Sequence, residues 1–170
     1  MSIEEIKKIC NKYDIKNYTI NSDGTIDVND DVNLYNKGLK KLPLNFRNVS
    51  GYFNCSYNQL TSLEGSPSQV GYFYCGYNQL ISLEGAPISI SGYFDCSYNN
   101  LTSLEGAPSS VGGSFYCNDN KITSLEGAPS SVGGGFYCSN NPVYEELGDI
   151  DYIAYIKMCN RNKKLEELLK

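Results

Sequence analysis

A block of 20 to 21 residues is repeated along the middle of this chain. Aligned on cysteine, the blocks read GYFNCSYNQLTSLEGSPSQV, GYFYCGYNQLISLEGAPISIS, GYFDCSYNNLTSLEGAPSSVG and GSFYCNDNKITSLEGAPSSVG, and a partial block reads GGFYCSNNPV. Self-similarity at this period is typical of solenoids. One block cannot bury its own apolar side, so stacking has to supply the core. We therefore expect a solenoid, and the length of 170 residues predicts a single domain over 1–170.

The letters within one block predict which side chains form the core. Alternate side chains of a strand face opposite sides, so Phe53 and Cys55 are predicted to point inward while Tyr52 and Asn54 point outward. The amide of Asn58 is predicted to bond backbone groups of its own loop and of the next coil, and the later copies would extend this into a ladder. Leucines after the Asn return to the core, as Leu60 and Leu63 do in this block.

The end of each block predicts a sharp bend without helix. The sequence EGSP or EGAP places glycine where φ can be positive and proline where the outgoing direction is fixed. We expect the side opposite the strands to be irregular. The glycines are Gly65, Gly85, Gly106 and Gly127, and the prolines are Pro67, Pro87, Pro108 and Pro129.

These residues resemble a known family. The block F-x-C-x-x-N-x-L-x-S-L is similar to the leucine-rich repeat core L-x-L-x-x-N-x-L over residues 32–143. Its first, degenerate unit is VNLYNKGLKKLP, with Val32, Leu34, Leu39 and Leu42 in equivalent positions. The resemblance implies a leucine-rich repeat solenoid of the α/β class, with a parallel β-sheet on its concave face and an irregular convex side.

Both ends of the array are predicted to be closed by caps. SIEE predicts a capping box from Ser2 to Glu5, followed by an apolar helical stripe of Ile3, Ile6, Ile9 or Cys10, and Tyr13. YTINSDGTIDV predicts a hairpin through Asp23 and Gly24, and residues 1–31 then form an N-terminal helix and hairpin cap. Residues 144–170 are predicted to be a helical C-terminal cap, interrupted at 160–162. Its apolar spacing comes from Leu147, Ile150, Ile153, Ala154, Met158, Leu165 and Leu168.

The charges exclude some partner classes. Between Gly51 and Asn140 the only base is Lys121, against two Asp and four Glu, a net charge of −5. Nucleic acid and anionic membranes need a Lys/Arg footprint, so we expect neither as a partner. No apolar run reaches the roughly 20 residues of a membrane span, and MSIEEIKKIC lacks the apolar stretch of a secretory signal. We expect a cytoplasmic location.

Neither cysteine nor glutamate predicts a cofactor or metal site. Cys55, Cys75, Cys96, Cys117 and Cys138 occupy one repeat position, and the chain has no His and no C-x-x-C pair. Small buried hydrophobes are the favoured interpretation. A calcium site on the column Glu64, Glu84, Glu105 and Glu126 is the less favoured alternative to a solvated or backbone-capping role.

The outward strand positions carry the predicted binding site. Nine of the 15 tyrosines fall on 20 such positions, among them Ser56, Gly76, Ser97 and Ser114, and no Thr, Val or Ile occurs there. Strand propensity alone would accept those residues, whereas Tyr with Ser, Asn, Asp and Gly matches recognition surfaces. The predicted partner-binding residues are Tyr52, Asn54, Tyr57, Tyr72, Tyr74, Tyr77, Tyr93, Asp95, Tyr98, Tyr116, Asp119 and Tyr137.

The resulting hypothesis is a non-enzymatic module that binds a protein with a neutral to basic patch. SLEGAP and GGFYC also resemble small leucine-rich repeat proteins of tailed bacteriophages and some bacteria. That resemblance implies a phage accessory protein in the host cytoplasm that inhibits a host factor such as a defence enzyme. Two alternatives stay open. They are a hydrolase or transferase using Asp95 and Asp119, and a structural protein that self-associates through its tyrosines.

Overall fold

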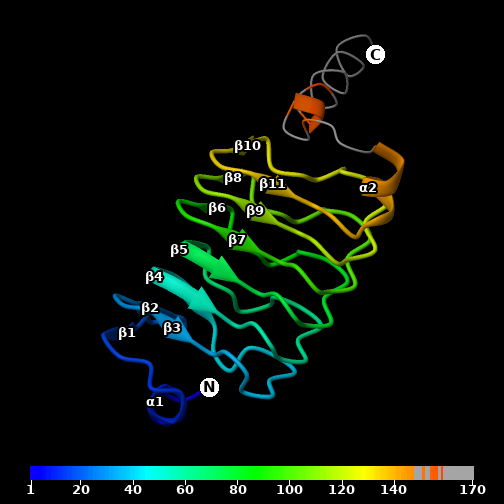
Figure 1. Ribbon diagram of the computed structural model, residues 1–170. Coiled ribbons are helices and arrows are strands. Elements are labelled where there is room, and N and C mark those ends of the chain that lie inside the picture. The colour runs from blue at the N-terminus through cyan, green and yellow to red at the C-terminus, as the bar shows by residue number, and fades with distance from the viewer. Residues whose placement is uncertain (148–150, 152–153, 157, 159–170) are drawn as a thin grey trace, which may run out of the picture.

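The computed structural model describes residues 1–147, 151, 154–156 and 158, and these form a solenoid of stacked coils joined by a parallel sheet (Figure 1). Each coil contributes strand residues that pair in parallel with those of the coils before and after it. The strands are β3 (Val32–Asn33), β4 (Phe46–Asn54), β5 (Gln69–Tyr74), β6 (Ser89–Ile90), β7 (Phe94–Asp95), β8 (Ser110–Val111), β9 (Phe115–Tyr116), β10 (Ser131–Val132) and β11 (Phe136–Tyr137).

The sheet contains two ladders where the repeat predicted one. One ladder aligns Phe53, Phe73, Phe94, Phe115 and Phe136, with Val32 beside Phe53. The other aligns Val49, Val70, Ile90, Val111 and Val132. From β6 onward a bend separates the two strands of a coil, so each is only two residues long. Such short strands leave no alternating pattern in the sequence.

The core confirms the predicted direction of Phe and Cys. Phe53, Phe73, Phe94, Phe115 and the cysteines beside them are fully buried, and neighbouring Phe rings stack with centroids 5.1 to 5.7 Å apart. The outward prediction is wrong for Ser56, Gly76, Ser97 and Ser114, which are buried. Ser56, Gly76 and Ser97 follow strands that end at Asn54, Tyr74 and Asp95, so alternation does not extend to them. Ser114 lies just before the two-residue strand β9 and is also outside the alternating segment.

The predicted asparagine ladder is present. Asn99 Nδ2 donates to the carbonyl oxygens of Cys96 at 3.0 Å and Cys75 at 3.1 Å, and Asn99 Oδ1 accepts the Leu80 N–H at 2.9 Å. Equivalent bonds are made by Asn58, Asn78, Asn120 and Asn141. The neighbouring coil that each Asn bonds is the preceding one in the chain, not the following one. Each asparagine of the ladder therefore bonds its own coil to the coil that precedes it in the chain.

The predicted bends also form. Gly65, Gly85, Gly106 and Gly127 have φ between 80° and 88°, and the Ala86 N–H donates to the Leu83 carbonyl at 2.9 Å across one such turn. Between α1 (Ile3–Lys12) and α2 (Pro142–Leu147) the chain contains no helix. The irregular connection is thus confirmed for every described coil.

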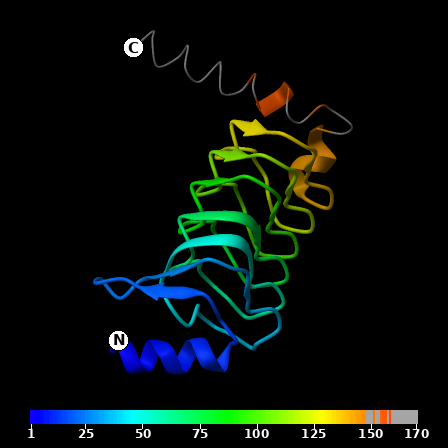
Figure 2. The same ribbon diagram turned by 90° about the vertical axis from the view of Figure 1, so that its left-hand side faces the viewer.

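The N-terminal segment lies at one end of the stack (Figure 2). Ser2 and Glu5 form the predicted capping box of α1, and β1 (Tyr18–Ile20) pairs antiparallel with β2 (Ile26–Val28) as the predicted hairpin. β2 then pairs in parallel with β4, which joins the hairpin to the sheet. The apolar stripe is wrong at Ile3, which is 58% exposed, because α1 packs on the coil through Ile6 and Cys10.

The C-terminal prediction is tested only in part. Residues 154–156 and 158 are helical, and Ile156 is buried while Ala154 and Met158 are exposed. In this stretch, therefore, the side of the helix that is buried is not the side on which the apolar spacing placed Ala154 and Met158. Ile150, Ile153, Leu165, Leu168 and the interruption at 160–162 lie outside the described residues, and the side chain of Leu147 is not described.

Candidate functional site: a tyrosine face over the strands

The twelve predicted site residues lie in three parallel columns over the Phe ladder, which together we call the tyrosine face. The pre-Phe column contains Tyr52, Tyr72 and Tyr93, followed by Ser114 and Gly135. The strand column contains Asn54, Tyr74, Asp95, Tyr116 and Tyr137, aligned by the sheet register. The turn column contains Tyr57, Tyr77, Tyr98, Asp119 and Asn140.

All nine tyrosines of this face reach solvent. Tyr57, Tyr72, Tyr77, Tyr93, Tyr98 and Tyr137 are exposed, and Tyr52, Tyr74 and Tyr116 are half-buried. Seven of the nine rings also contact another ring of the face, as Tyr116 and Tyr137 do with centroids 4.8 Å apart. The face therefore presents aromatic rings with hydroxyl groups to solvent.

The turn column has an unusual backbone. Tyr57, Tyr77 and Tyr98 have φ of 57°, 54° and 56°, in the left-handed region. The same position holds Asn36 in the coil before and Asp119 and Asn140 in the coils after, also with positive φ. Asn and Asp tolerate this conformation, whereas Tyr is strained in it by about 1 kcal/mol or more per residue. The middle coils carry tyrosine where the backbone favours a short polar residue.

The strained tyrosines form one stack. The rings of Tyr57 and Tyr77 lie 4.1 Å apart at 15°, and those of Tyr77 and Tyr98 lie 4.1 Å apart at 13°. The ring of Tyr35 contacts that of Tyr57, with the centroids 5.0 Å apart and the ring planes at 53°. Aromatic contacts contribute roughly 0.5–1.5 kcal/mol each, which offsets the strain in part. Each of these rings therefore packs against at least one neighbouring ring of the column.

Glycines that the sequence did not single out shape the face. A Cβ on Gly92 would lie 2.3 Å from the ring of Tyr72, and a Cβ on Gly113 would lie 2.6 Å from the ring of Tyr93. Each ring therefore covers the glycine of the next coil. The paired glycines and Ser-Gly before Phe are the sequence signal that could have revealed this.

The two carboxylates of the face serve local structure. Asp95 Oδ1 accepts the Ser97 N–H at 2.9 Å, as Asn54 Oδ1 does for Ser56 at 3.0 Å. Asp119 Oδ1 accepts from Asn140 Nδ2 at 2.8 Å. They stand in different columns on adjacent coils. In the part of the chain that the structure describes, neither Asp95 nor Asp119 forms an ion pair with a basic side chain.

The surroundings of Tyr57, Tyr74 and Tyr77 favour the protonated form of their hydroxyl groups. A hydrogen bond with Tyr77 and partial burial raise the pKa of Tyr57. Burial, followed by nearby phenols and the Asp95 charge, raises the pKa of Tyr74. For Tyr77 the hydrogen bond with Tyr57 lowers the pKa, but the bond with Tyr98, burial and neighbouring charges outweigh it, and the net direction is upward. These phenols remain donors at neutral pH.

The cysteine column lies in the core, and no disulfide joins the cysteines that the structure describes. Burial raises the pKa of the Cys55 thiol to about 12 and the pKa values of Cys75, Cys96 and Cys117 well above the ordinary value, so these four thiols are protonated at neutral pH. No group of three or more metal-ligating side chains occurs among the described residues. Glu64, Glu84, Glu105 and Glu126 are exposed.

We expect these core thiols to resist alkylation in the folded protein. At about pH 8, iodoacetamide should modify Cys55, Cys75, Cys96 and Cys117 only as fast as the protein unfolds, because thiolate is the reacting form.

The free energy of unfolding should fall as the pH rises from 9.0 toward about 12, because the thiols of the unfolded chain lose their protons at lower pH than the buried thiols do. Mass spectrometry of labelled peptides and unfolding at several pH values measure both effects. Rapid labelling under native conditions would contradict this.

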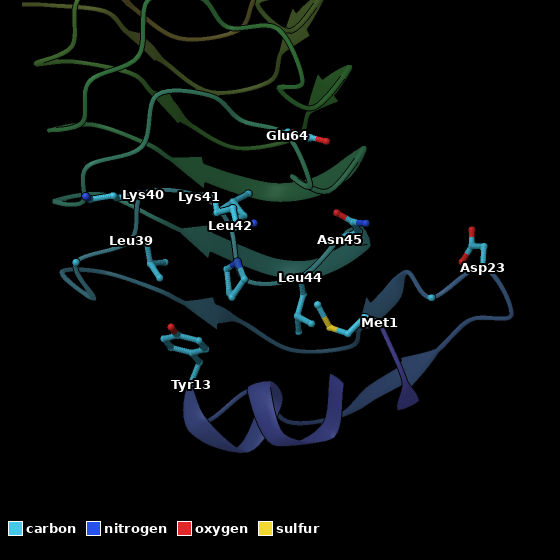
Figure 3. A pocket seen from close by; sticks show the side chains of 13 residues that line it. Met1, Tyr13, Asp23, Leu39, Lys40, Lys41, Leu42, Leu44, Asn45 and Glu64 are labelled. Carbon is cyan, nitrogen blue, oxygen red and sulfur yellow. The ribbon is translucent and has the colours of Figure 1, made fainter. Parts of the chain in front are cut away.

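Among the surface depressions near the N-terminal end, two can be compared with the tyrosine face. One, of about 550 Å³, has Leu39, Leu42 and Leu44 on the loop side and Met1 and Tyr13 on the α1 side (Figure 3). It contains no residue of the three columns. The other, of about 510 Å³, is polar and continues the tyrosine face at Tyr52 and Tyr35; its walls include Lys16 and Lys37.

Comparisons with family models, curated proteins and solved structures return no match for this chain. None of the helices in the described part of the chain is both long and apolar enough to cross a bilayer. Inferences about function therefore depend on the geometry of the face.

Proposed function

We propose that this chain is a leucine-rich repeat protein, capped by residues 1–31 and 144–170, that binds a partner protein through its tyrosine face. The supporting observation is the strain in the turn column. Tyr57, Tyr77 and Tyr98 occupy left-handed positions that Asn36, Asp119 and Asn140 occupy without strain in other coils. Strain of this kind clusters at functional sites, where another requirement outweighs stability.

The chemistry of the face fits a protein partner. Stacked tyrosines offer rigid area with hydroxyl donors, which is the composition of protein-recognition surfaces. With Lys121 as the only base between Gly51 and Asn140, a neutral to basic patch is the complementary surface. The proposed mechanism is occlusion of the partner by a preformed concave surface in the cytoplasm. Inhibition of a host defence protein by a phage-encoded chain is the biological setting we propose.

The test replaces the three strained tyrosines with the residue of the neighbouring coils. A Tyr57→Asn, Tyr77→Asn, Tyr98→Asn variant should keep its unfolding free energy within about 1 kcal/mol of the parent, because strain relief offsets the lost ring contacts. Its affinity for the partner should fall by about a hundredfold or more, since anchors of this kind dominate interfaces. Capture from host extract identifies a partner, and titration with the purified partner measures the loss.

The matched control removes apolar groups from another surface. Ile81 and Ile88 are 69% and 70% exposed and outside the three columns. Ile81→Thr with Ile88→Ser installs the residues of sister coils, and this variant should bind as the parent does. Equal binding by the tyrosine variant would overturn the proposal. Concentration-dependent sedimentation of the parent, lost in the tyrosine variant, would instead indicate self-association.

A further inference from the structure

The tyrosine stack of the turn column ends at Tyr98, and Asp119 holds the next position of the column; we call the position beside Tyr98 and Asp119 the slot. Tyr98 stacks on Tyr77 through one ring face, and it makes no other ring contact in the described part of the chain. In the next coil the same position holds Asp119, with Tyr98 donating its N–H to Asn118 and Asp119 donating its N–H to Ser139, both at 3.0 Å. A short carboxylate thus stands where the next ring would have been.

Asp119 keeps an unused hydrogen-bonding oxygen. Oδ1 accepts from Asn140, and within the described residues Oδ2 has no hydrogen bond and the carboxylate has no ion pair. The side chain is half-buried, and Lys121 makes no ion pair with it. The slot therefore combines an exposed ring with one face that no other ring stacks on, a negative charge and a free acceptor.

We propose that this slot receives the guanidinium group of an arginine on the partner protein, stacked on Tyr98 and paired with Asp119. This inference rests on the proposed function, and it identifies an arginine as the partner residue that anchors the interface. A guanidinium group is planar, stacks on aromatic faces, and donates hydrogen bonds to a carboxylate from its edge. A lysine ammonium supplies the charge without the plane, so the slot discriminates between the two bases.

The opposite end of the stack does not offer such a site. There the outer face of Tyr57 is met by Tyr35, at 5.0 Å. The adjoining depression is lined by charges of both signs, Lys16 and Lys37 with Asp14, Asp30 and Asp31, and Lys16 already pairs with Asp14. Between the ends, each ring face is covered by its neighbour. Tyr98 is the position in the turn column where an open face and a carboxylate coincide.

The test uses the full chain and three blocked tripeptides that differ at the central residue: glycyl-arginyl-glycine and its lysine and citrulline analogues. In nuclear magnetic resonance titrations, the arginine peptide should shift the Tyr98 ring signals, and its own δ-methylene protons should move upfield from stacking. Lysine should bind about threefold or more weakly without that upfield shift, and citrulline, which is planar but neutral, should bind more weakly than arginine.

Asp119→Asn and Tyr98→Asn are the decisive variants, since asparagine tolerates the positive φ of both positions. Asp119→Asn should weaken arginine binding about threefold, and Tyr98→Asn should remove the upfield shift. Ile81→Thr, which copies the sister coils at an exposed position outside the three columns, should change neither. Equal binding of all three peptides, no binding, or no effect of Asp119→Asn would overturn the arginine slot. Retained partner capture in that case leaves the tyrosine face intact as the binding surface, so the two failures are distinguishable.

Discussion

Replacing Asn99 with alanine is expected to destabilise the protein by about 3 kcal/mol. The side chain is buried and bonds two carbonyls of its own coil, one of the coil before, and the Leu80 N–H. Alanine leaves that N–H buried without a partner, at about 1–3 kcal/mol, and removes one of the bonds that each carbonyl accepts. The carbonyls of Cys75, Cys96 and Ser97 keep Asn78 Nδ2, Asn120 Nδ2 and the Tyr77 N–H as donors. Since a domain is stable by only about 5–15 kcal/mol, the loss should be plain in urea unfolding.

The control for this change is the next residue. Asn100 is half-buried and its side chain makes no hydrogen bond within the described residues. Asn100→Ala should therefore alter stability by no more than about 0.5 kcal/mol. A loss of under about 1 kcal/mol for Asn99→Ala would show that water replaces the amide and that the ladder contributes little.

Gly106→Ala is expected to destabilise by about 3 kcal/mol for two separable reasons. Its φ of 83° strains an alanine, and the added Cβ would lie 2.5 Å from the Glu84 nitrogen and 2.6 Å from the Leu83 carbonyl carbon. The second effect arises because the EGAP turns stack backbone on backbone. Thermal and urea unfolding of the purified variant measure the sum.

Gly24 separates the two causes. It has nearly the same φ, 82°, but an added Cβ would meet nothing within 4 Å, since the hairpin turn is open. Gly24→Ala should therefore show the backbone strain alone, about 1 kcal/mol. Equal effects of the two substitutions would mean that the coils can separate at the turn without penalty.

The repeat made much of this architecture predictable. Phe53, Cys55, Asn58 and the turn glycine recur in every full block, so an error at one copy would have been visible in the others. The second ladder was not predictable, because strands such as Ser110–Val111 are too short for a pattern. Nor was the positive φ of Tyr57, since tyrosine gives no sign of a left-handed backbone.

The sequence predicted which residues form the surface of the site, but not how their side chains are arranged. Alternation around Phe and Cys placed the tyrosines outward, but it does not say that Tyr77 and Tyr98 stack at 4.1 Å. It also extended too far at Ser56 and Ser97, where the chain is already turning. Side-chain direction follows alternation only while the strand lasts, and tertiary packing decides the rest.

The uniform spacing of the inter-coil bonds has a consequence for how such a chain can change over generations. Asn78, Asn99, Asn120 and Asn141 each reach back 23 or 24 residues to a cysteine carbonyl. Inserting or deleting one whole 21-residue unit would restore the same bonds at the seam and alter the length of the molecule by about 4.8 Å. Copy number is thus a free variable for evolution, and the footprint on a target can lengthen or shorten stepwise while every interior contact is kept.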